Sequence, residues 1–374
     1  MRIALLSTCA VAVPPSGYGG TELIIAELAR TLERNGHQVT VFATGDSTPE
    51  AELRSHFAAP VWPPDDLAEL RHSAFAWSSI CAEDPPFDVV HAHQAHAIAF
   101  SAVCRVPTVL TLHHERIEKL VQYYRDFHDV TPVAISRRQA ELLPELGTCQ
   151  VVHHGLDIDR YDAGERDGRD KRSKRDPSDD GWLAFVGRFA PEKGPDIAID
   201  VASALRLPLR MGGKPHWANG EFFEQEIAPR LKHASDLVRW EGEVSFEPKL
   251  ELLRGARATL FPIAWEEPFG LVMIESMLVG TPVVAFARGA APEVVDEGVT
   301  GFLVHDKAEM IDRLRRIGTI DRARCRARAR ERFNSTRMTR DYERVYARAI
   351  AASRASPPRP LAPSGVQLTR AATR

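Results

Sequence analysis

Short, nearly continuous apolar runs recur in two separate series along this chain of 374 residues. Amphipathic stretches lie between most of them, and the stretch from Thr21 to Glu33 places Leu23, Ile24, Leu28 and Leu32 on one side. Strands that are apolar throughout and alternate with helices are typical of a parallel sheet covered on both faces. The runs of the first series are Ile3 to Leu6, Val39 to Ala43, Val89 to Ala92, Val109 to Leu112, Pro132 to Ile135 and Val151 to His153.

The second series repeats this pattern, and both halves open with an apolar strand, a glycine-containing loop and a helix. Two such units facing each other would place the carboxyl ends of both sheets around one cleft. The sequence therefore predicts an α/β protein with two Rossmann-like, doubly wound domains that face a central cleft. The runs of this series are Leu183 to Val186, Leu207 to Met211, Leu237 to Trp240, Ala258 to Phe261, Val283 to Phe286 and Phe302 to Val304.

Shifts in composition predict the domain boundaries. We expect residues 1–159 to form the first domain and residues 182–335 to form the second. Residues 160–181 are charged and nearly free of large apolar side chains, which indicates an exposed linker. The helical stretch 336–353 is expected to pack back on the first domain, and the tail 357–374 is expected to be disordered.

The overall composition excludes several classes of protein. With 44% hydrophobic and 26% charged residues, the chain resembles an ordinary soluble globular protein, and its net charge of -3 gives no general attraction to nucleic acid. Its 5 cysteines form no CxxC pair, which argues against a disulfide framework or a cysteine zinc site and fits a reducing cytoplasm. No apolar segment is long enough to predict a membrane span.

The segment EPFGLVMIE, from Glu267 to Glu275, carries the most information about function. Pro268, Phe269 and Gly270 are expected to open a helix, and Glu275 falls inside that helix among apolar neighbours. A buried carboxylate needs hydrogen-bond donors, such as the hydroxyls of a sugar or a ribose, and the unpaired amides at the helix start would attract a phosphate. The alternative is a core helix in which Glu275 finds backbone or arginine partners.

Two glycine-containing loops follow predicted strands. In PPSGYGGTE, Gly17, Gly19 and Gly20 would let the backbone approach an anion, although the loop lacks the GxGxxG dinucleotide pattern and a plain tight turn remains the alternative. In FVGRFAPEKG, Arg188 and Lys193 place two cations beyond a strand, which suits a diphosphate. Ordinary solvated surface charge is the alternative for both cations.

Histidines cluster at the ends of two apolar runs, in VVHAHQAH and TLTLHHE. His91 and His93 would share one face of a strand, but no carboxylate accompanies them, so we expect no metal. His113 ends a strand at the expected edge of the cleft, where its ring could donate a hydrogen bond to a sugar hydroxyl. A purely structural histidine is the alternative at this position.

Two further segments have competing interpretations. The sequence DID at Asp157 to Asp159 is similar to the metal-binding DxD of another transferase architecture, but its position after HGL favours a turn or a helix cap. The arginine-rich run from Arg313 to Arg332 could contact acidic lipid headgroups, whereas its interleaved alanines favour a solvated helix face.

Taken in order, these motifs resemble the family 4 retaining glycosyltransferases of the GT-B fold, also called glycosyltransferase group 1. The resemblance covers almost the whole chain, and its most specific parts are the E-x7-E spacing of Glu267 and Glu275 and the loop with Arg188 and Lys193. It implies transfer of a sugar from a nucleotide-diphosphate donor with retention of configuration, without a metal ion or another cofactor. The motifs are PPSGYGGTE, DVVHAH, TLHH, HGLD, FVGRFAPEKG, EGEVSFEPKLELL and EEPFGLVMIESMLVGTPVVA.

The resemblance also implies roles for individual residues. Arg188 and Lys193 would hold the donor diphosphate, Glu267 and His113 would contact the sugar, and Glu275 would bind the ribose. These first four are the candidate catalytic residues. The candidate donor-binding residues are Gly19, Gly20, Arg188, Lys193, Val244, Glu267, Phe269, Gly270, Leu271 and Glu275. Where relatives often have NGVD, this chain has HGLD at residues 154–157, which puts any asparagine-specific contact there in doubt.

We therefore expect a hexosyltransferase that uses a UDP-hexose, or next a GDP-sugar, and a hydroxyl acceptor that is a saccharide, a lipid-linked molecule or a small molecule. We expect it to act in the cytoplasm, with contact to the inner membrane face as one option, and to bind no nucleic acid. An epimerase or a phosphorylase of the same fold and a non-catalytic nucleotide-sugar-binding module are the alternatives. A nicotinamide oxidoreductase is disfavoured because GxGxxG is absent from the first turn. Acceptor choice should lie in the loops Val11 to Tyr18, His56 to Ala76 and Glu115 to Asp129.

Overall fold

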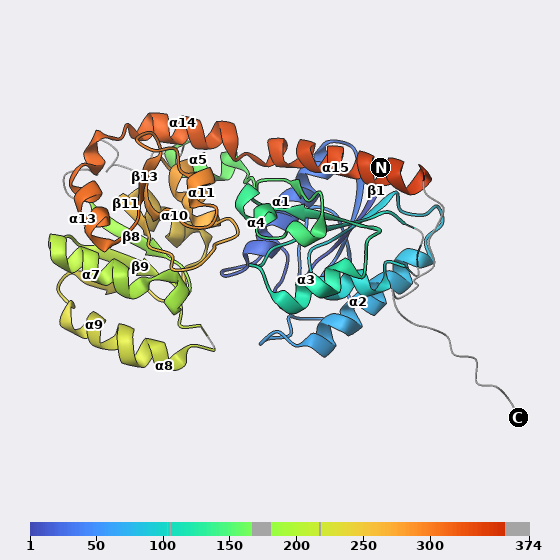
Figure 1. Ribbon diagram of the computed structural model, residues 1–374, viewed down its shortest axis with the longest axis horizontal. Coiled ribbons are helices and arrows are strands. Elements are labelled where there is room, and N and C mark those ends of the chain that lie inside the picture. Colours follow the sequence, from blue (N-terminus) through green and yellow to red (C-terminus); the bar gives the residue numbers. More distant parts are fainter. Residues whose placement is uncertain (103, 105, 167–180, 217, 356–374) are drawn as a thin grey trace, which may run out of the picture.

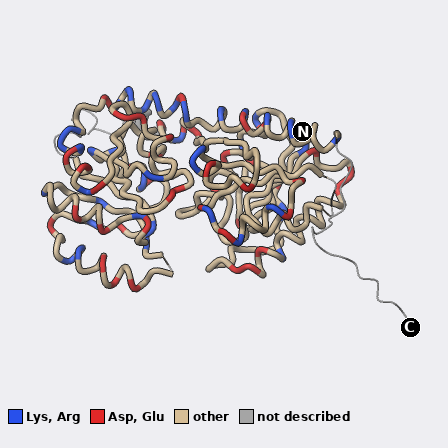
Figure 2. Tube along the Cα trace, in the orientation of Figure 1, with Lys and Arg blue, Asp and Glu red and all other residues tan. Residues whose placement is uncertain are grey.

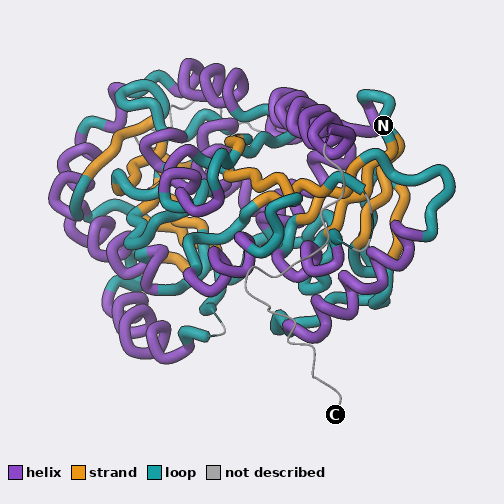
Figure 3. Tube along the Cα trace, turned by 45° about the vertical axis from the view of Figure 1, so that its right-hand side comes forward, coloured by secondary structure: helices purple, strands orange, loops and turns teal. Residues whose placement is uncertain are grey.

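The computed structural model describes residues 1–102, 104, 106–166, 181–216 and 218–355, and it contains two parallel sheets side by side (Figure 1). The first is a 7-stranded sheet with the order β3-β2-β1-β4-β5-β6-β7, and the second is a 6-stranded sheet with the order β10-β9-β8-β11-β12-β13. Helices surround the strands of both sheets (Figure 3). The prediction of an α/β protein built from two doubly wound units is confirmed.

The first sheet comprises β1 (Arg2–Leu6), β2 (Gln38–Phe42), β3 (Glu52–Arg54), β4 (Val89–Ala92), β5 (Thr108–Thr111), β6 (Val130–Ala134) and β7 (Gln150–Val151). Its helices are α1 (Gly20–Arg34), α2 (Asp66–Cys81), η1 (Ala95–Phe100), α3 (Glu118–Arg125), α4 (Arg137–Glu141) and η2 (Pro144–Leu146). The strand β3 was not predicted, because it is a charged edge strand of 3 residues that pairs only with β2.

The second sheet comprises β8 (Trp182–Val186), β9 (Leu209–Gly212), β10 (Val238–Trp240), β11 (Ala256–Phe261), β12 (Val283–Phe286) and β13 (Gly301–Val304). Its helices are α5 (Ile158–Arg166), η3 (Pro191–Lys193), α7 (Pro195–Leu205), α8 (Gly220–Phe222), η4 (Phe223–Ile227), α9 (Ala228–His233), α10 (Phe246–Arg254), α11 (Leu271–Leu278), α12 (Ala291–Val294), α13 (Lys307–Arg315), η5 (Ile317–Thr319) and α14 (Arg322–Arg332).

The central strands are buried on both faces, which explains why they are apolar throughout. Every residue of β4, β5 and β12 is buried. Helices cover the sheets from either side, so side chains that point up and side chains that point down both enter a core. The polar residues that line the cleft therefore lie in the loops after the strands and in the helices that follow those loops, and not in the strands themselves.

The expected linker 160–181 is wrong at its beginning. Residues 160–166 belong to α5, and Tyr161 is only 3% exposed. Its ring packs edge-on against Phe246 at 5.5 Å between centroids. The high charge of this segment led to its prediction as an exposed linker, although its single tyrosine packs into the second domain. The remainder of the predicted linker up to residue 180 lies outside the described residues.

The last helix, α15 (Ser335–Ala355), runs back over the first domain and packs against α1 (Figure 1). The two chain crossings between the domains lie together, because Leu156 N donates to Phe333 O and Ser335 N donates to Leu156 O, each at 2.9 Å. Tyr342 and Tyr346 of α15 are fully buried. The helix thus extends slightly beyond the predicted bounds 336–353, and the predicted disordered tail 357–374 lies outside the described residues.

Basic residues lie along the length of α14 (Figure 2). Several of its arginines bind the second domain and do not point freely into solvent. Arg328 donates to Asp296 at 2.6 Å, and Arg332 donates to the same carboxylate at 2.5 Å. Arg330 pairs with Asp162 of α5. The expectation of a simply solvated helix face is therefore wrong for these residues. Within the described part of the chain, no helix combines the length and the apolar character that a bilayer span requires.

Candidate active site

A cavity of about 380 Å³ lies between the two sheets, among the loops that follow the strands. Both domains contribute to its wall, and it collects every residue that the sequence analysis proposed for catalysis or donor binding. These are Gly19, Gly20, His113, Arg188, Lys193, Val244, Glu267, Phe269, Gly270, Leu271 and Glu275. Their individual roles remain predictions, but the structure brings them together around one space.

The centre of the second-domain wall is a pair of opposite charges. Lys193 Nζ forms an ion pair with Glu267 Oε2, and Trp265 Nε1 donates to the same oxygen at 2.9 Å. The lysine also lies over the Trp265 ring, at 4.7 Å from its centroid. The two charged side chains are only 17% and 11% exposed. Since buried charges are stable only when paired, this lysine is held at a fixed place before any ligand arrives.

The second cation, Arg188, lies in the loop after β8 and reaches Glu192 at 3.4 Å. Its side chain is 23% exposed, and it lines the same cavity as Lys193. Neither cation is therefore an ordinary solvated surface charge. Two cations in one partly desolvated space attract an anion more strongly than they would in bulk water, because the effective dielectric constant is lower.

Two helices begin at this cavity without a side-chain cap among the described residues. Gly270 precedes α11 with φ 88, in the left-handed region that glycine tolerates best, and Gly19 precedes α1. A Cβ at Gly20 would lie 3.2 Å from Leu271 Cδ1, so the two helix starts approach each other across the domain interface. The first amides of each helix lack intrahelical partners and carry positive partial charge. The arrangement suits a phosphate group.

The carboxylate of Glu275 is satisfied by partners that the sequence analysis missed. Glu275 is 3% exposed, and its Oε1 accepts from Lys249 Nζ at 2.5 Å and from the Tyr161 hydroxyl at 3.1 Å. Burial, together with the charge of Glu275, holds the pKa of Tyr161 well above its ordinary value. Neither partner was predicted: Lys249 lies within the motif EGEVSFEPKLELL without an assigned role, and Tyr161 lies in the expected linker.

Histidine rings cluster at the first-domain wall, where His113 and His154 line the cavity. His113 Nε2 lies 2.9 Å from His93 Nδ1, and the ring of His113 stacks on that of His154 at 5.4 Å between centroids. The ring of His154 in turn meets Phe269 of the second domain at 4.9 Å. Burial lowers the pKa of His113 to about 3 and holds the pKa of His93 and His154 well below the usual range. These rings are therefore neutral near pH 7 and act as aromatic surface.

The histidine cluster does not form the arrangement of a metal site. Both ring nitrogens of His91 are engaged, with the hydroxyls of Tyr346 at 2.8 Å and Thr111 at 2.7 Å. His96 instead lies 3.4 Å from the carboxylate of Asp66. Among the described residues, no three His, Cys, Asp or Glu side chains gather as the ligands of a metal ion would.

The DID segment forms a turn at the start of α5. Asp157 accepts from Asp159 N at 3.1 Å and pairs with Arg30 at 3.2 Å. The carboxylate of Asp157 therefore stabilises local structure and the packing of α5 near α1, as the interpretation as a turn or cap predicted.

Each half of the chain matches a family of glycosyltransferases. Residues 18–160 match the family described as Glycosyltransferase Family 4, and residues 167–332 match the family described as Glycosyl transferases group 1. A D-inositol 3-phosphate glycosyltransferase of Mycolicibacterium smegmatis is 29% identical to this chain, over 96% of this chain and 94% of that protein.

Solved structures share the arrangement of the two domains. AviGT4, a glycosyltransferase involved in avilamycin A biosynthesis, superimposes with a TM-score of 0.68 at 24% identity, over 94% of this chain and 98% of that one. HepE of Anabaena, solved in complex with UDP-glucose, gives a TM-score of 0.71 at 19% identity, over 93% of this chain and 100% of that one. At these identities the likeness shows the fold.

Proposed function

Because the chain belongs to the family 4 glycosyltransferases of the GT-B fold, we propose that it transfers a hexosyl group from a nucleotide-diphosphate sugar to a hydroxyl acceptor, with retention of configuration and without a metal ion. The observation that carries the proposal is the fixed positive charge of Lys193 beside two uncapped helix starts. Negative charge builds on the diphosphate as it leaves, and preorganised positive groups stabilise that charge with little rearrangement.

The proposed roles follow the positions of the side chains. Arg188 and Lys193 bind the diphosphate, and the first amides of α11 complete its surroundings. Glu267 lies beside Lys193 and accepts a hydrogen bond from a hydroxyl of the transferred sugar. Glu275, held by Lys249 and Tyr161, accepts from the hydroxyls of the ribose. The neutral His113 borders the sugar on the opposite wall.

The proposed reaction needs no protein nucleophile. The acceptor oxygen forms a bond to the anomeric carbon on the face from which the diphosphate departs. The bond between that carbon and the phosphate oxygen breaks, and its electron pair stays on the phosphate. The proton of the acceptor hydroxyl passes to the departing phosphate oxygen, which balances the step. Closure of the two domains would exclude water and limit hydrolysis.

We further propose that the donor is a UDP-hexose, with a GDP-sugar as the next choice. The Anabaena protein of the same fold was solved with UDP-glucose, which supports this assignment. The nucleotide sugar is a substrate, and we propose no resident cofactor. A cytoplasmic location with contact to the inner membrane face is likewise a proposal, since cytoplasm is where nucleotide sugars and reduced cysteines would both be expected.

The test has two stages. A thermal-shift panel of UDP-, GDP- and ADP-sugars should show the largest rise in Tm with a UDP-sugar, because binding to the native state stabilises it. Transfer from that donor to a hydroxyl acceptor is then measured in the presence of EDTA, which removes metal ions. The anomeric configuration of the product is read from its proton NMR coupling. We expect undiminished turnover and a retained configuration. An inverted product, turnover that returns only with Mg²⁺, or epimerisation of the donor alone would overturn the proposal.

A further inference from the structure

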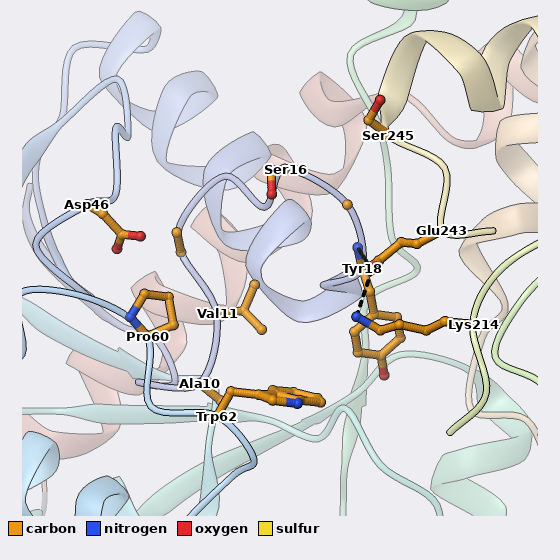
Figure 4. Close-up of a pocket in the computed structure, with 12 residues that line it drawn as sticks. Ala10, Val11, Ser16, Tyr18, Asp46, Pro60, Trp62, Lys214, Glu243 and Ser245 are labelled. Carbon is orange, nitrogen blue, oxygen red and sulfur yellow. Dashed lines mark hydrogen bonds and ion pairs between the residues drawn. The ribbon is translucent and has the colours of Figure 1, made fainter. Parts of the chain in front are cut away.

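A second cavity, of about 540 Å³, lies beside the first. Figure 4 shows the residues that line it. Ser16, Asp46 and Trp62 contribute to its wall from the first domain, and Lys214, Glu243 and Ser245 contribute from the second. The two cavities share the segment from Ser16 to Tyr18 and the Lys214–Glu243 pair. A molecule in the second cavity would therefore lie next to a molecule bound in the first.

Trp62 is placed in this wall by backbone contacts. The preceding residue, Val61, donates from its N to Cys9 O at 2.9 Å, which ties the loop before α2 to the loop after β1. Lys214 Nζ lies 5.8 Å from the centroid of the Trp62 ring, so the second domain also touches it. Trp62 nevertheless remains 47% exposed. A large aromatic ring held in place but left half uncovered offers an apolar surface to a ligand.

The charges around this cavity oppose an anionic ligand. Among the described residues that line it, Lys214 carries the single positive charge, and Glu243 already accepts from its Nζ at 2.7 Å. Glu243 also accepts from Tyr18 N at 3.2 Å, which joins the two domains at this point. Asp46 adds a second carboxylate, whose Oδ1 accepts from the Thr44 hydroxyl at 2.6 Å. The lining charges sum to a negative value, and a phosphate would be repelled.

We propose that this cavity is the acceptor site and that the acceptor is an uncharged saccharide, not a phosphorylated polyol; this rests on the glycosyl transfer proposed above. The Trp62 ring packs against the C–H face of a sugar ring. Asp46, Ser16 and Ser245 exchange hydrogen bonds with its hydroxyls, for which carboxylates and hydroxyls are suitable partners. One sugar hydroxyl at the opening beside Tyr18 then faces the donor.

The proposal is tested with the full-length protein saturated with UDP. Saturation-transfer NMR compares methyl glycosides of glucose, galactose, mannose and xylose, together with maltose, against glucose 6-phosphate and inositol 3-phosphate. We expect a signal from at least one neutral glycoside and none from the phosphates. A signal confined to the phosphates, or no signal from any neutral glycoside, would overturn the inference.

Variants locate the binding to this cavity. Trp62→Ala should weaken binding of the neutral glycoside about tenfold, and Trp62→Phe should restore most of it, because an aromatic face suffices. Asp46→Lys should reverse the preference toward glucose 6-phosphate. Leu67→Ala, at a 64% exposed position of α2, is the matched control and should change nothing. Unchanged binding in both Trp62→Ala and Asp46→Lys would place the acceptor elsewhere.

Failure of this inference and failure of the proposed function give different results. The thermal shift with UDP reports the donor cavity and should persist in Trp62→Ala. If the wild-type protein shows no shift with any nucleotide or nucleotide sugar, the proposed donor is wrong. If the UDP shift is present but the glycosides bind independently of Trp62 and Asp46, only the acceptor assignment is wrong.

Discussion

The second domain lines the cleft with charged side chains that already have partners, whereas the first domain lines it with glycine, neutral histidine rings and exposed aromatics. Lys193 is paired with Glu267 and Lys249 is paired with Glu275 on one side. His113 stacks on His154 on the other. The difference indicates that the second domain is preorganised for a charged molecule and the first for an uncharged one, which suits a nucleotide-sugar donor facing a hydroxyl acceptor.

The largest expected effect tests the charged wall. Lys193→Ala should lower kcat/KM for the donor by about 10²–10³-fold, because it removes a fixed group that stabilises the leaving diphosphate. Steady-state kinetics with the donor found by thermal shift provides the measurement. Lys232→Ala removes an exposed lysine of α9 and is the control, with an unchanged kcat/KM. Wild-type values for Lys193→Ala would mean that the charged wall does not act on the leaving group.

A smaller effect is expected at the other pair of the same wall. Glu275→Gln should raise KM for the donor by about tenfold with little change in kcat, because a ribose contact is made equally in the ground state and the transition state. Loss of this charge also leaves Lys249 without its partner, so Tm should fall. Glu247→Ala, at an exposed position of α10, is the matched control. A fall in kcat at constant KM would move Glu275 from binding to chemistry.

The smallest expected effect is on the pH dependence of stability, and it concerns the neutral histidine rings of the first-domain wall. Burial lowers the pKa of His113 to about 3, whereas in the unfolded chain its pKa is about 6.5. Between pH 3 and pH 6.5, therefore, His113 binds a proton in the unfolded chain but not in the folded one. Stability therefore falls as the pH drops from 7 toward 3. In His113→Phe the aromatic stack is kept but this proton site is lost, so the fall in Tm between pH 7 and pH 5 should be smaller than in the wild type.

The control for this comparison is His128→Phe, which changes an exposed histidine and should leave the pH dependence of Tm as it is. The pKa of Glu27 and Glu69 is raised to about 7 by burial, which acts in the opposite direction. Both glutamates are present in every variant, so the difference between proteins isolates His113. Equal pH dependence in the wild type and His113→Phe would show that His113 is protonated normally in the folded state.

Much of the architecture could be predicted from local pattern. Central strands are apolar because helices cover both faces, so their runs stand out in the sequence, whereas β3 is short, charged and paired on one side. Gly19, Arg188 and Lys193 could be located because glycines and charges follow strands, whereas other candidate site residues, such as Val244, came from the resemblance to the family. Lys249 and Tyr161 were missed because each meets Glu275 only through the tertiary fold, and 114 residues separate Tyr161 from Glu275.

The stacking of His113 on His154 could not be predicted from the sequence either. Nothing in VVHAHQAH or TLHH shows that His113 would meet His154, which belongs to a different strand loop, or that burial would keep both rings neutral. Patterns give the positions of side chains along elements, but the pairing of distant loops is set by how the strands order themselves in the sheet.

The paired crossings at Leu156 and Asn334 limit how the molecule can move. These residues form a parallel bridge, and a Cβ at Gly155 would lie 2.2 Å from Asn334 O, so the two connections are in tight contact. Because the two connections between the domains lie side by side, we expect them to act as a single hinge. The two domains should then rotate about this hinge without sliding past each other. Small-angle scattering should then show a smaller radius of gyration with UDP than without it. One rotation of the domains would bring donor and acceptor together.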